Sequence, residues 1–224
     1  MDYTFQWGVA FSYVPYLLGG AWITLHLTFV GFVLGLILGL AAAVAQVYGG
    51  PVLRRVASAY ITFFTNTPSL VTAFFIFYGL PEIGILWSPY VCILVNLALN
   101  AGAFLADVFR GGINSVRKTE LEAAEVMGFS LLAQVRYVIA PHIAKSLYPP
   151  IANLYIIFIL GSALASIFGV EELTGRAFNV DAETFRSIEI YTIAAGLYVF
   201  MTIAASMFLA ALGRYVFRVK TKVF

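Results

Sequence analysis

The sequence predicts an all-α integral membrane protein with five membrane-spanning helices. Hydrophobic residues make up 62% of the 224 positions and charged residues 11%, and the mean hydropathy is +0.93, which excludes a water-soluble domain with a polar surface. Uncharged apolar stretches longer than the roughly 20 residues that cross a bilayer core recur along the whole chain. The formal net charge of +2 is too small to imply a nucleic acid as a partner, and we expect none. The lipid bilayer is therefore the expected surroundings of most of the chain.

Five apolar runs, bounded by charged residues, glycine and proline, define the expected helices. They lie at about Leu17–Val47, Ala57–Leu80, Tyr90–Phe109, Ile139–Phe168 and Ile188–Val216. We expect them to form one transmembrane domain over residues 1–224. The odd number of spans places the two termini on opposite sides of the membrane.

The basic residues indicate the orientation, because cytoplasmic loops are enriched in Lys and Arg. Of the 13 basic residues, only Arg176 and Arg186 fall in the loops of one side. The other eleven lie in the alternate loops or at their edges: Arg54, Arg55, Arg110, Arg117, Lys118, Arg136, Lys145, Arg214, Arg218, Lys220 and Lys222. We therefore predict an outer N-terminus and a cytoplasmic C-terminus.

Small residues recur at every fourth position of the first and third spans. The two sets are Gly31, Gly35, Gly39 and Ala98, Gly102, Ala106. This spacing aligns the small residues on one face of each helix, where a second helix can approach closely. We interpret both sets as helix-packing surfaces without a role in transport.

The connection between the third and fourth spans, residues 115–130, is too polar to cross the membrane and is predicted to form a short cytoplasmic helix. Thr119, followed three residues later by Glu122, has the pattern of a capping box at a helix N-terminus. Gly128 lies where a helix C-terminus is expected. Such a short helix presents a small, partly apolar surface that suits docking into a groove of a partner.

This connection resembles the EAA loop of ABC importer permeases. The resemblance is carried by Glu122-Ala123-Ala124, then Gly128, nine further residues, and Val138-Ile139-Ala140-Pro141. Ala140 stands where the family has leucine. Four further segments are similar, in order and spacing, to the polar amino-acid (histidine/glutamine/glutamate-type) permease family: Asn66-Thr67-Pro68, Phe77–Pro81, Leu99–Ile113 and Ala165–Val170. The resemblance covers about residues 16–215.

The resemblance departs from the family pattern in two places. Thr65 stands where many members have arginine, and Leu160–Leu164 replaces a Lys-Asp-Thr-Ser-Leu segment. The loss of that lysine and aspartate makes a standard amino-acid site less secure, and the ligand remains open among polar amino acids and related solutes.

The resemblance implies a type I ABC importer permease fold in the bacterial plasma membrane. The short helix is then the coupling helix seated in an ATPase subunit, with the expected contact residues Leu121, Glu122, Ala123, Ala124, Glu125 and Gly128. The chain has no Gly-Lys dipeptide and hence no phosphate-binding loop of the Walker A kind. ATP-Mg is thus expected on the partner, and we predict no catalytic residue, metal ligand or cofactor in this chain.

The partners implied by the resemblance are an ABC ATPase dimer, a second permease chain, identical or paralogous, and an extracytoplasmic solute-binding protein. The outer loops available to the binding protein are Pro81–Pro89 and Gly169–Ser187. The second of these is an expected mixed-charge surface, either for docking or merely solvated, with Glu171, Glu172, Asp181, Glu183, Arg176 and Arg186.

Polar residues near mid-depth of the spans are the candidates for the substrate path. They are Asn66, Thr67, Asn96, Asn100, Asn153, Ser162 and Ser166. Thr67-Pro68 is able to break a helix and free backbone carbonyl groups. The alternative for each side chain is an ordinary interhelical hydrogen bond, which contributes roughly 0.6 kcal/mol.

Two other functions fit parts of the sequence. An ion-gradient-driven transporter or a channel would also use five spans and mid-membrane asparagines. An intramembrane hydrolase would need Ser162 as nucleophile and His26 or His142 as base. His142 and Ser162 lie roughly 30 Å apart if the helix is continuous, and neither histidine has an acidic partner at helical spacing.

Overall fold

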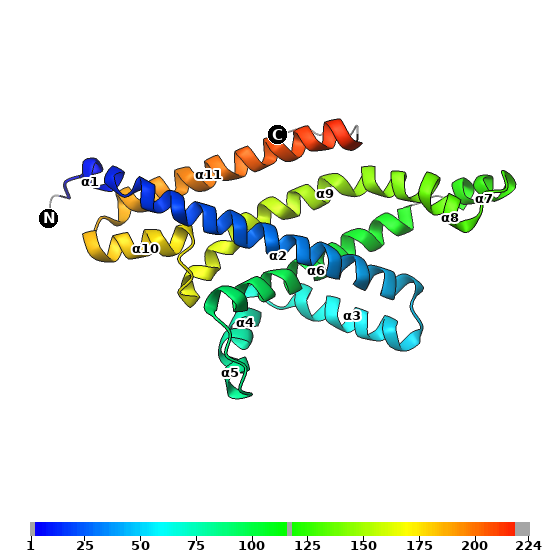
Figure 1. The fold of residues 1–224 in the computed structure, drawn as a ribbon, viewed down its shortest axis with the longest axis horizontal. Coiled ribbons are helices and arrows are strands. Elements are labelled where there is room, and N and C mark those ends of the chain that lie inside the picture. The colour runs from blue at the N-terminus through cyan, green and yellow to red at the C-terminus, as the bar shows by residue number, and fades with distance from the viewer. Residues whose placement is uncertain (1–2, 116–117, 218–224) are drawn as a thin grey trace. The chain divides into compact units, whose positions relative to one another are not determined.

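The computed structural model describes residues 3–115 and 118–217, and all regular structure in these ranges is helical (Figure 1). Four of the basic residues used above for the orientation lie outside the described residues: Arg117, Arg218, Lys220 and Lys222. The helices are α1 Trp7–Ser12, α2 Val14–Tyr48, α3 Pro51–Asn66, α4 Ser69–Phe74, α5 Leu80–Glu82, α6 Pro89–Ser115, α7 Lys118–Val126, α8 Leu131–Gln134, α9 Ala140–Gly161, α10 Leu173–Thr184 and α11 Ser187–Leu212.

Short turns of other helical types extend several of these elements. π-helical turns follow α4, α8 and α11, at Phe75–Gly79, Val135–Ile139 and Gly213–Phe217. A 3₁₀ segment, Ser162–Phe168, follows α9.

Within the described residues, four stretches are long and apolar enough to cross a membrane, which confirms four of the predicted spans in place and type. They are Val14–Tyr48, Pro89–Ser115, Ile143–Phe168 and Ser187–Val216. The helix predicted at about Ala57–Leu80 is interrupted at Thr67-Pro68, the pair expected to be able to break a helix, and α3 and the segment Ser69–Glu82 are bent by 108° at this break.

Proline causes this break. Pro68 has no N–H to continue the helix, and it disfavours helical geometry at the residue before it. Thr67 is accordingly extended, with φ −112° and ψ 129°. The chain restarts at once, since the carbonyl group of Pro68 accepts the N–H groups of Val71 and Thr72. The second apolar run therefore consists of two helical segments with a sharp bend between them.

The chain folds as two compact units. Unit 1 lies within Met1–Val33, Pro68–Ala98 and Tyr155–Ala205, and unit 2 within Leu34–Thr67, Leu99–Leu154 and Ser206–Phe224. The long helices α2, α6 and α11 each contribute residues to both units. In unit 1, one buried cluster joins α1, α2, α10 and α11 through Ala10, Leu17, Ala21, Leu173, Ala177, Val180, Ile190, Ala194 and Met201.

The small-residue faces of α2 and α6 pack closely, as predicted. In unit 2, a Cβ atom added at Gly39 would lie 2.7 Å from the carbonyl oxygen of Gly102 and 2.8 Å from Cβ of Leu105. A Cβ atom at Gly102 would lie 2.5 Å from the Tyr60 hydroxyl oxygen. That hydroxyl group donates a hydrogen bond to the carbonyl group of Leu99 at 2.7 Å. A side chain at either glycine would force the helices apart.

Candidate functional site

Helix α7, Lys118–Val126, lies in the segment predicted to contact an ATPase. The predicted end of this helix at Gly128 is confirmed. The N–H of Gly128 donates to the carbonyl group of Glu125 at 2.8 Å, and the N–H of Phe129 to that of Ala124 at 3.0 Å. This hydrogen-bond pattern is a Schellman motif, and Gly128 adopts the left-handed conformation that it requires, with φ +79°.

The predicted capping box at Thr119 is wrong. Helix α7 begins at Lys118, so Thr119 lies inside its first turn instead of preceding it. A helix with Thr119 as its N-cap would begin at Glu120, so helical geometry extends two residues further toward the N-terminus than the sequence pattern indicated.

The described side chains of α7 give one buried contact and an exposed surface. Ala124 is fully buried, whereas Glu122, Ala123 and Glu125 are exposed. Leu121 lies on the same helix. A Cβ atom at Gly128 would meet nothing within 4 Å. The surface beside this glycine is therefore open for another chain to approach.

Two apolar residues at the end of α7 were missed by the sequence analysis. Val126 is 90% exposed and Met127 is 65% exposed. Apolar side chains this exposed at the tip of a polar connection are typical of a surface that a partner covers. We name the exposed residues of this tip the α7 surface: Glu122, Ala123, Glu125, Val126, Met127 and Gly128.

Among the substrate-path candidates, Asn96 holds the restarted segment of the second apolar run. Its amide oxygen accepts the hydroxyl group of Thr72 at 2.6 Å, and its amide nitrogen lies 3.0 Å from the hydroxyl oxygen of Ser69 and 3.3 Å from the Ser69 carbonyl oxygen. Asn96 is buried, and its amide group forms interhelical hydrogen bonds between α6 and α4.

The hydroxyl groups of Ser162 and Ser166 bond within their own segment. They donate at 2.7 Å to the carbonyl groups of Ile159 and Ala163. Ser162 is buried and Ser166 half-buried. These contacts satisfy the two hydroxyl groups locally.

The remaining candidates are distributed over α3, α6 and α9. Asn66 is exposed and its amide nitrogen donates to the carbonyl group of Thr62 at 2.8 Å. Thr67, at the end of α3, is half-buried and Asn153, on α9, is exposed. Asn100, on α6, is buried.

The hydrolase geometry is absent from the described side chains. The ring nitrogen Nδ1 of His26 lies 2.7 Å from the Tyr90 hydroxyl oxygen, and the Ser162 hydroxyl group bonds to its own helix. His26 is thus not within hydrogen-bond reach of that serine, as a nucleophile would require, and the side chain of His142 lies outside the described ones.

A buried carboxylate, Glu172, is the main polar centre that the sequence analysis missed. The expectation that it belongs to a mixed-charge surface, whether for docking or merely solvated, is wrong for this residue, because its side chain is fully buried. It caps α10 by accepting the N–H of Gly175 at 2.9 Å. It also accepts the hydroxyl groups of Thr24 at 3.0 Å and Tyr198 at 2.8 Å. Glu172 therefore joins α2, α10 and α11.

Burial is the largest influence on Glu172 and raises the pKa of its carboxyl group, while the hydrogen bonds that it accepts act in the opposite direction. The backbone of α2 also packs closely against the start of α10. A Cβ atom at Gly20 would lie 2.9 Å from Cα of Leu173 and 3.1 Å from the carbonyl carbon of Glu172. The start of α10 is thus fixed against α2 by close contact as well as by hydrogen bonds.

A second buried carboxylate, Glu189, holds the N-terminal segment. It accepts the N–H of Gln6 at 2.9 Å and the hydroxyl group of Tyr3. Arg186 donates to the carbonyl group of Thr4 at 2.8 Å. The chain before α1 is therefore attached to the start of α11.

Comparison with known proteins assigns the family. The family described as binding-protein-dependent transport system inner membrane component matches residues 31–218. The glutamine transport system permease protein GlnP of Escherichia coli strain K12 is 33% identical over 212 residues, which cover 94% of this chain and 97% of that relative. The nopaline transport system permease protein NocM of Agrobacterium fabrum strain C58 is 31% identical, covering 86% of this chain and 84% of that relative.

A solved structure supports the same assignment. A chain of the structure described as an amino acid ABC transporter with histidines is 31% identical, with a TM-score of 0.89 over 96% of this chain and all of that chain. Members of the family are transport components of the inner membrane, and ATP hydrolysis belongs to a separate ATPase. The chain therefore belongs to the binding-protein-dependent transport system inner membrane components, within the polar amino-acid ABC transporter permeases.

Proposed function

We propose that the chain forms the translocation path of an ATP-driven importer for polar amino acids or amino-acid-like solutes and transmits the motion of its ATPase through α7. The observation that carries the proposal is the family match together with the exposed, glycine-terminated tip of α7. ATP-Mg is bound and hydrolysed by the partner, and this chain supplies no cofactor site.

The α7 surface is the proposed contact with the ATPase. Glu122 and Glu125 offer carboxylate groups, and Val126 and Met127 offer apolar area that is otherwise left in water. Ala123 has a small side chain and Gly128 has none, so neither protrudes from the surface, which suits insertion into a cleft. Buried Ala124 fixes the helix to the rest of its own chain. Leu121 completes the set of proposed coupling residues.

The five-span topology is proposed with the N-terminus outside and the C-terminus in the cytoplasm, the broken segment over α3–α5 counting as the second span. The division of charge between the units supports this orientation. The described residues of unit 1 include two basic and six acidic side chains, whereas those of unit 2 include seven basic and four acidic side chains. Positive charge concentrates on the cytoplasmic side of membrane proteins, so unit 2 is the proposed cytoplasmic half.

The proposed assembly contains two permease chains, identical or paralogous, an ABC ATPase dimer, and an extracytoplasmic solute-binding protein that docks on unit 1. The family implies the ATPase and the binding protein. The pairing of permease chains follows from the pairing of the ATPases, since each permease offers one α7 surface.

The proposed substrate class follows from the relatives. GlnP is named for glutamine and NocM for nopaline, so relatives of similar identity are named for different solutes. Asn66, Thr67, Asn100 and Asn153 remain the proposed path residues. Asn96, Ser162 and Ser166 are proposed only as secondary contacts, because their side chains form hydrogen bonds inside the fold.

The proposed function is tested by purifying a tagged copy of the chain from membranes of its source and identifying the chains that remain bound. ATP hydrolysis of the purified complex in lipid is then measured with the binding protein and single amino acids. Recovery of an ATPase whose activity rises with the binding protein and one class of amino acid supports the proposal. Uptake by the chain alone, without ATP, contradicts it and favours a gradient-driven carrier.

A further inference from the structure

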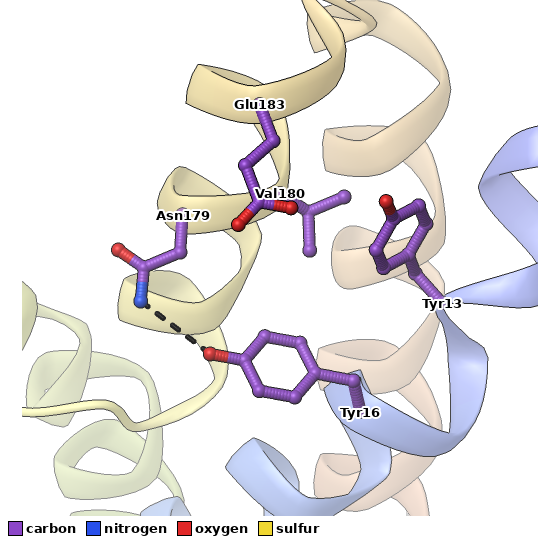
Figure 2. Close-up of a pocket in the computed structure, with 5 residues that line it drawn as sticks. All are labelled: Tyr13, Tyr16, Asn179, Val180 and Glu183. Atoms are coloured by element: carbon purple, nitrogen blue, oxygen red, sulfur yellow. Dashed lines mark hydrogen bonds between the residues drawn. The ribbon is translucent and has the colours of Figure 1, made fainter.

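Unit 1 contains a hollow of about 350 Å³ between the start of α2 and the C-terminal half of α10 (Figure 2). It is lined by Tyr13, Tyr16, Asn179, Val180 and Glu183. Figure 2 shows the Glu183 carboxylate group and both tyrosine rings directed toward the same space. The amide nitrogen of Asn179 lies 3.4 Å from the Tyr16 hydroxyl oxygen and closes one side.

The lining has the chemistry of a site for an organic cation. Within the described part of the chain, Glu183 makes no hydrogen bond or ion pair, and the Tyr13 hydroxyl group makes no hydrogen bond. A carboxylate group beside two aromatic rings is suited to a guanidinium or ammonium group, through a charge-assisted hydrogen bond and cation–π contacts. The lining therefore contains a carboxylate group and two aromatic rings but no basic side chain.

The neighbouring arginine illustrates the same chemistry. The guanidinium carbon of Arg176 lies 4.5 Å from the centroid of the Tyr16 ring, and its Nη1 atom donates to the Tyr16 carbonyl group at 2.7 Å. Arg176 does not line the hollow. The other described basic residue of unit 1, Arg186, is bonded to the carbonyl group of Thr4. Arg186 is thus engaged away from the hollow, whereas Arg176 covers part of the Tyr16 ring. The acidic side chains of the unit that are not buried attract a basic partner: Glu82, Glu171, Asp181 and Glu183.

Large aromatic side chains are exposed on the same helix and at its end. Phe178, next to Asn179, is 62% exposed, and Phe185, the residue that caps α10, is 81% exposed. Phe185 is also left-handed, with φ 54°, a conformation that is unfavourable for a bulky residue. Its N–H donates to the carbonyl group of Asp181 at 2.7 Å, which holds this geometry. Exposed aromatic residues are enriched at protein–protein interfaces.

The lining distinguishes a protein side chain from a free amino acid. The hollow has one acidic group and no basic group. A free cationic amino acid would bring its own carboxylate group beside Glu183, where no cation compensates it. The head of an arginine or lysine on a protein surface brings only the positive charge.

We propose that this hollow receives an arginine or lysine side chain of the extracytoplasmic binding protein, with Phe178 and Phe185 as the adjoining apolar contacts. This inference rests on the proposed function, which supplies such a partner. Beyond the proposed function, it specifies where on unit 1 the binding protein docks and which kind of side chain it inserts there.

The test uses the complete transporter in lipid nanodiscs and the purified solute-binding protein that raises its ATP hydrolysis. Glu183→Gln removes the charge and keeps the shape, and it should raise the half-maximal concentration of the binding protein about tenfold at low salt. The difference from the wild type should shrink as salt is added, because the lost interaction is between charges. Glu171→Gln makes the same change at an exposed residue outside the hollow and should change that concentration less than about twofold.

A charge exchange identifies the docking residue. With the Glu183→Lys transporter, one Arg→Glu or Lys→Glu variant of the binding protein should recover at least about half of the loss. The inference is overturned if Glu183→Gln and Glu171→Gln behave alike while the wild type is stimulated, or if free arginine or lysine binds the transporter alone and this binding is lost in Glu183→Gln. A wild-type complex that no binding protein stimulates overturns the proposed function as well.

Discussion

Replacement of Glu172 by alanine tests whether the buried carboxylate holds the start of α10 against α2 and α11. The change removes the acceptor for the N–H of Gly175 at 2.9 Å and for the hydroxyl groups of Thr24 and Tyr198 at 3.0 and 2.8 Å. Loss of a helix N-cap costs about 1 kcal/mol, and each buried donor left without an acceptor costs about 1–3 kcal/mol. Release of a buried charge offsets part of this, so we expect a net loss of about 3 kcal/mol.

The assay is thermal unfolding of the purified protein in detergent, followed by intrinsic fluorescence. A loss of about 3 kcal/mol lowers Tm by about 6–12 °C in a chain of this length. Glu171→Ala is the matched control, because Glu171 is the adjacent exposed carboxylate, and it should shift Tm by no more than about 2 °C. Equal Tm values for the two variants would refute the role assigned to Glu172.

Three further predictions concern Glu172, Gly39 and Asn96. Burial raises the pKa of the Glu172 carboxyl group, so the folded state keeps the carboxyl proton to higher pH than the unfolded state does. The stability that the protonated carboxyl group contributes is therefore present below the ordinary pKa and is lost as pH rises through the raised value. The Tm of the wild type should thus fall more steeply than that of Glu172→Gln as the pH rises above the ordinary pKa of a glutamate side chain, and equal slopes would contradict the assignment. Gly39→Ala should lower Tm by several degrees, since its Cβ atom would lie 2.7 Å from a backbone oxygen of α6; Gly196→Ala, where nothing lies within 4 Å, should leave Tm unchanged or slightly raised. Asn96→Leu should cost about 2 kcal/mol in denaturant titrations through the lost partners of Thr72 and Ser69, and a neutral effect would argue that these hydrogen bonds add nothing.

The sequence was sufficient for the features that depend on composition and local geometry. Apolar runs indicated the four long spans, because hydrocarbon requires about 20 apolar residues in helical form. The glycine spacing on α2 and α6 predicted the close packing observed at Gly39 and Gly102. Gly128 marked the end of α7, since the Schellman motif requires a residue that tolerates positive φ.

The break in the second span was only partly predictable. Thr67-Pro68 indicated a weak point, but proline alone does not determine whether a helix kinks slightly or turns by 108°. The restarted segment forms hydrogen bonds with Asn96, 27 residues beyond Ser69. Such a distant contact is not visible in a local pattern.

Glu172 escaped the sequence analysis for a similar reason. A glutamate in a polar connection is ordinarily solvated, and its two hydroxyl partners come from Thr24 and Tyr198, which lie 148 residues before it and 26 after it. One local signal was available: Glu172 precedes a helical stretch, a position where a side-chain oxygen caps the first turn. The signal indicates a cap but not its burial.

The central claim, that α7 transmits the work of a separate ATPase, is tested most directly by Gly128→Asp in the complete transporter. The aspartate must adopt φ near +79° and places a charge on the open side of the helix end. Gly84→Asp is the matched control, because Gly84 has φ +82° and equally open surroundings. ATP-driven uptake of the transported amino acid and the amount of ATPase retained on the purified chain are measured for both variants. Loss of uptake and of ATPase in Gly128→Asp, with ATPase retained in Gly84→Asp, is the predicted result; normal ATP-driven uptake in Gly128→Asp would contradict it.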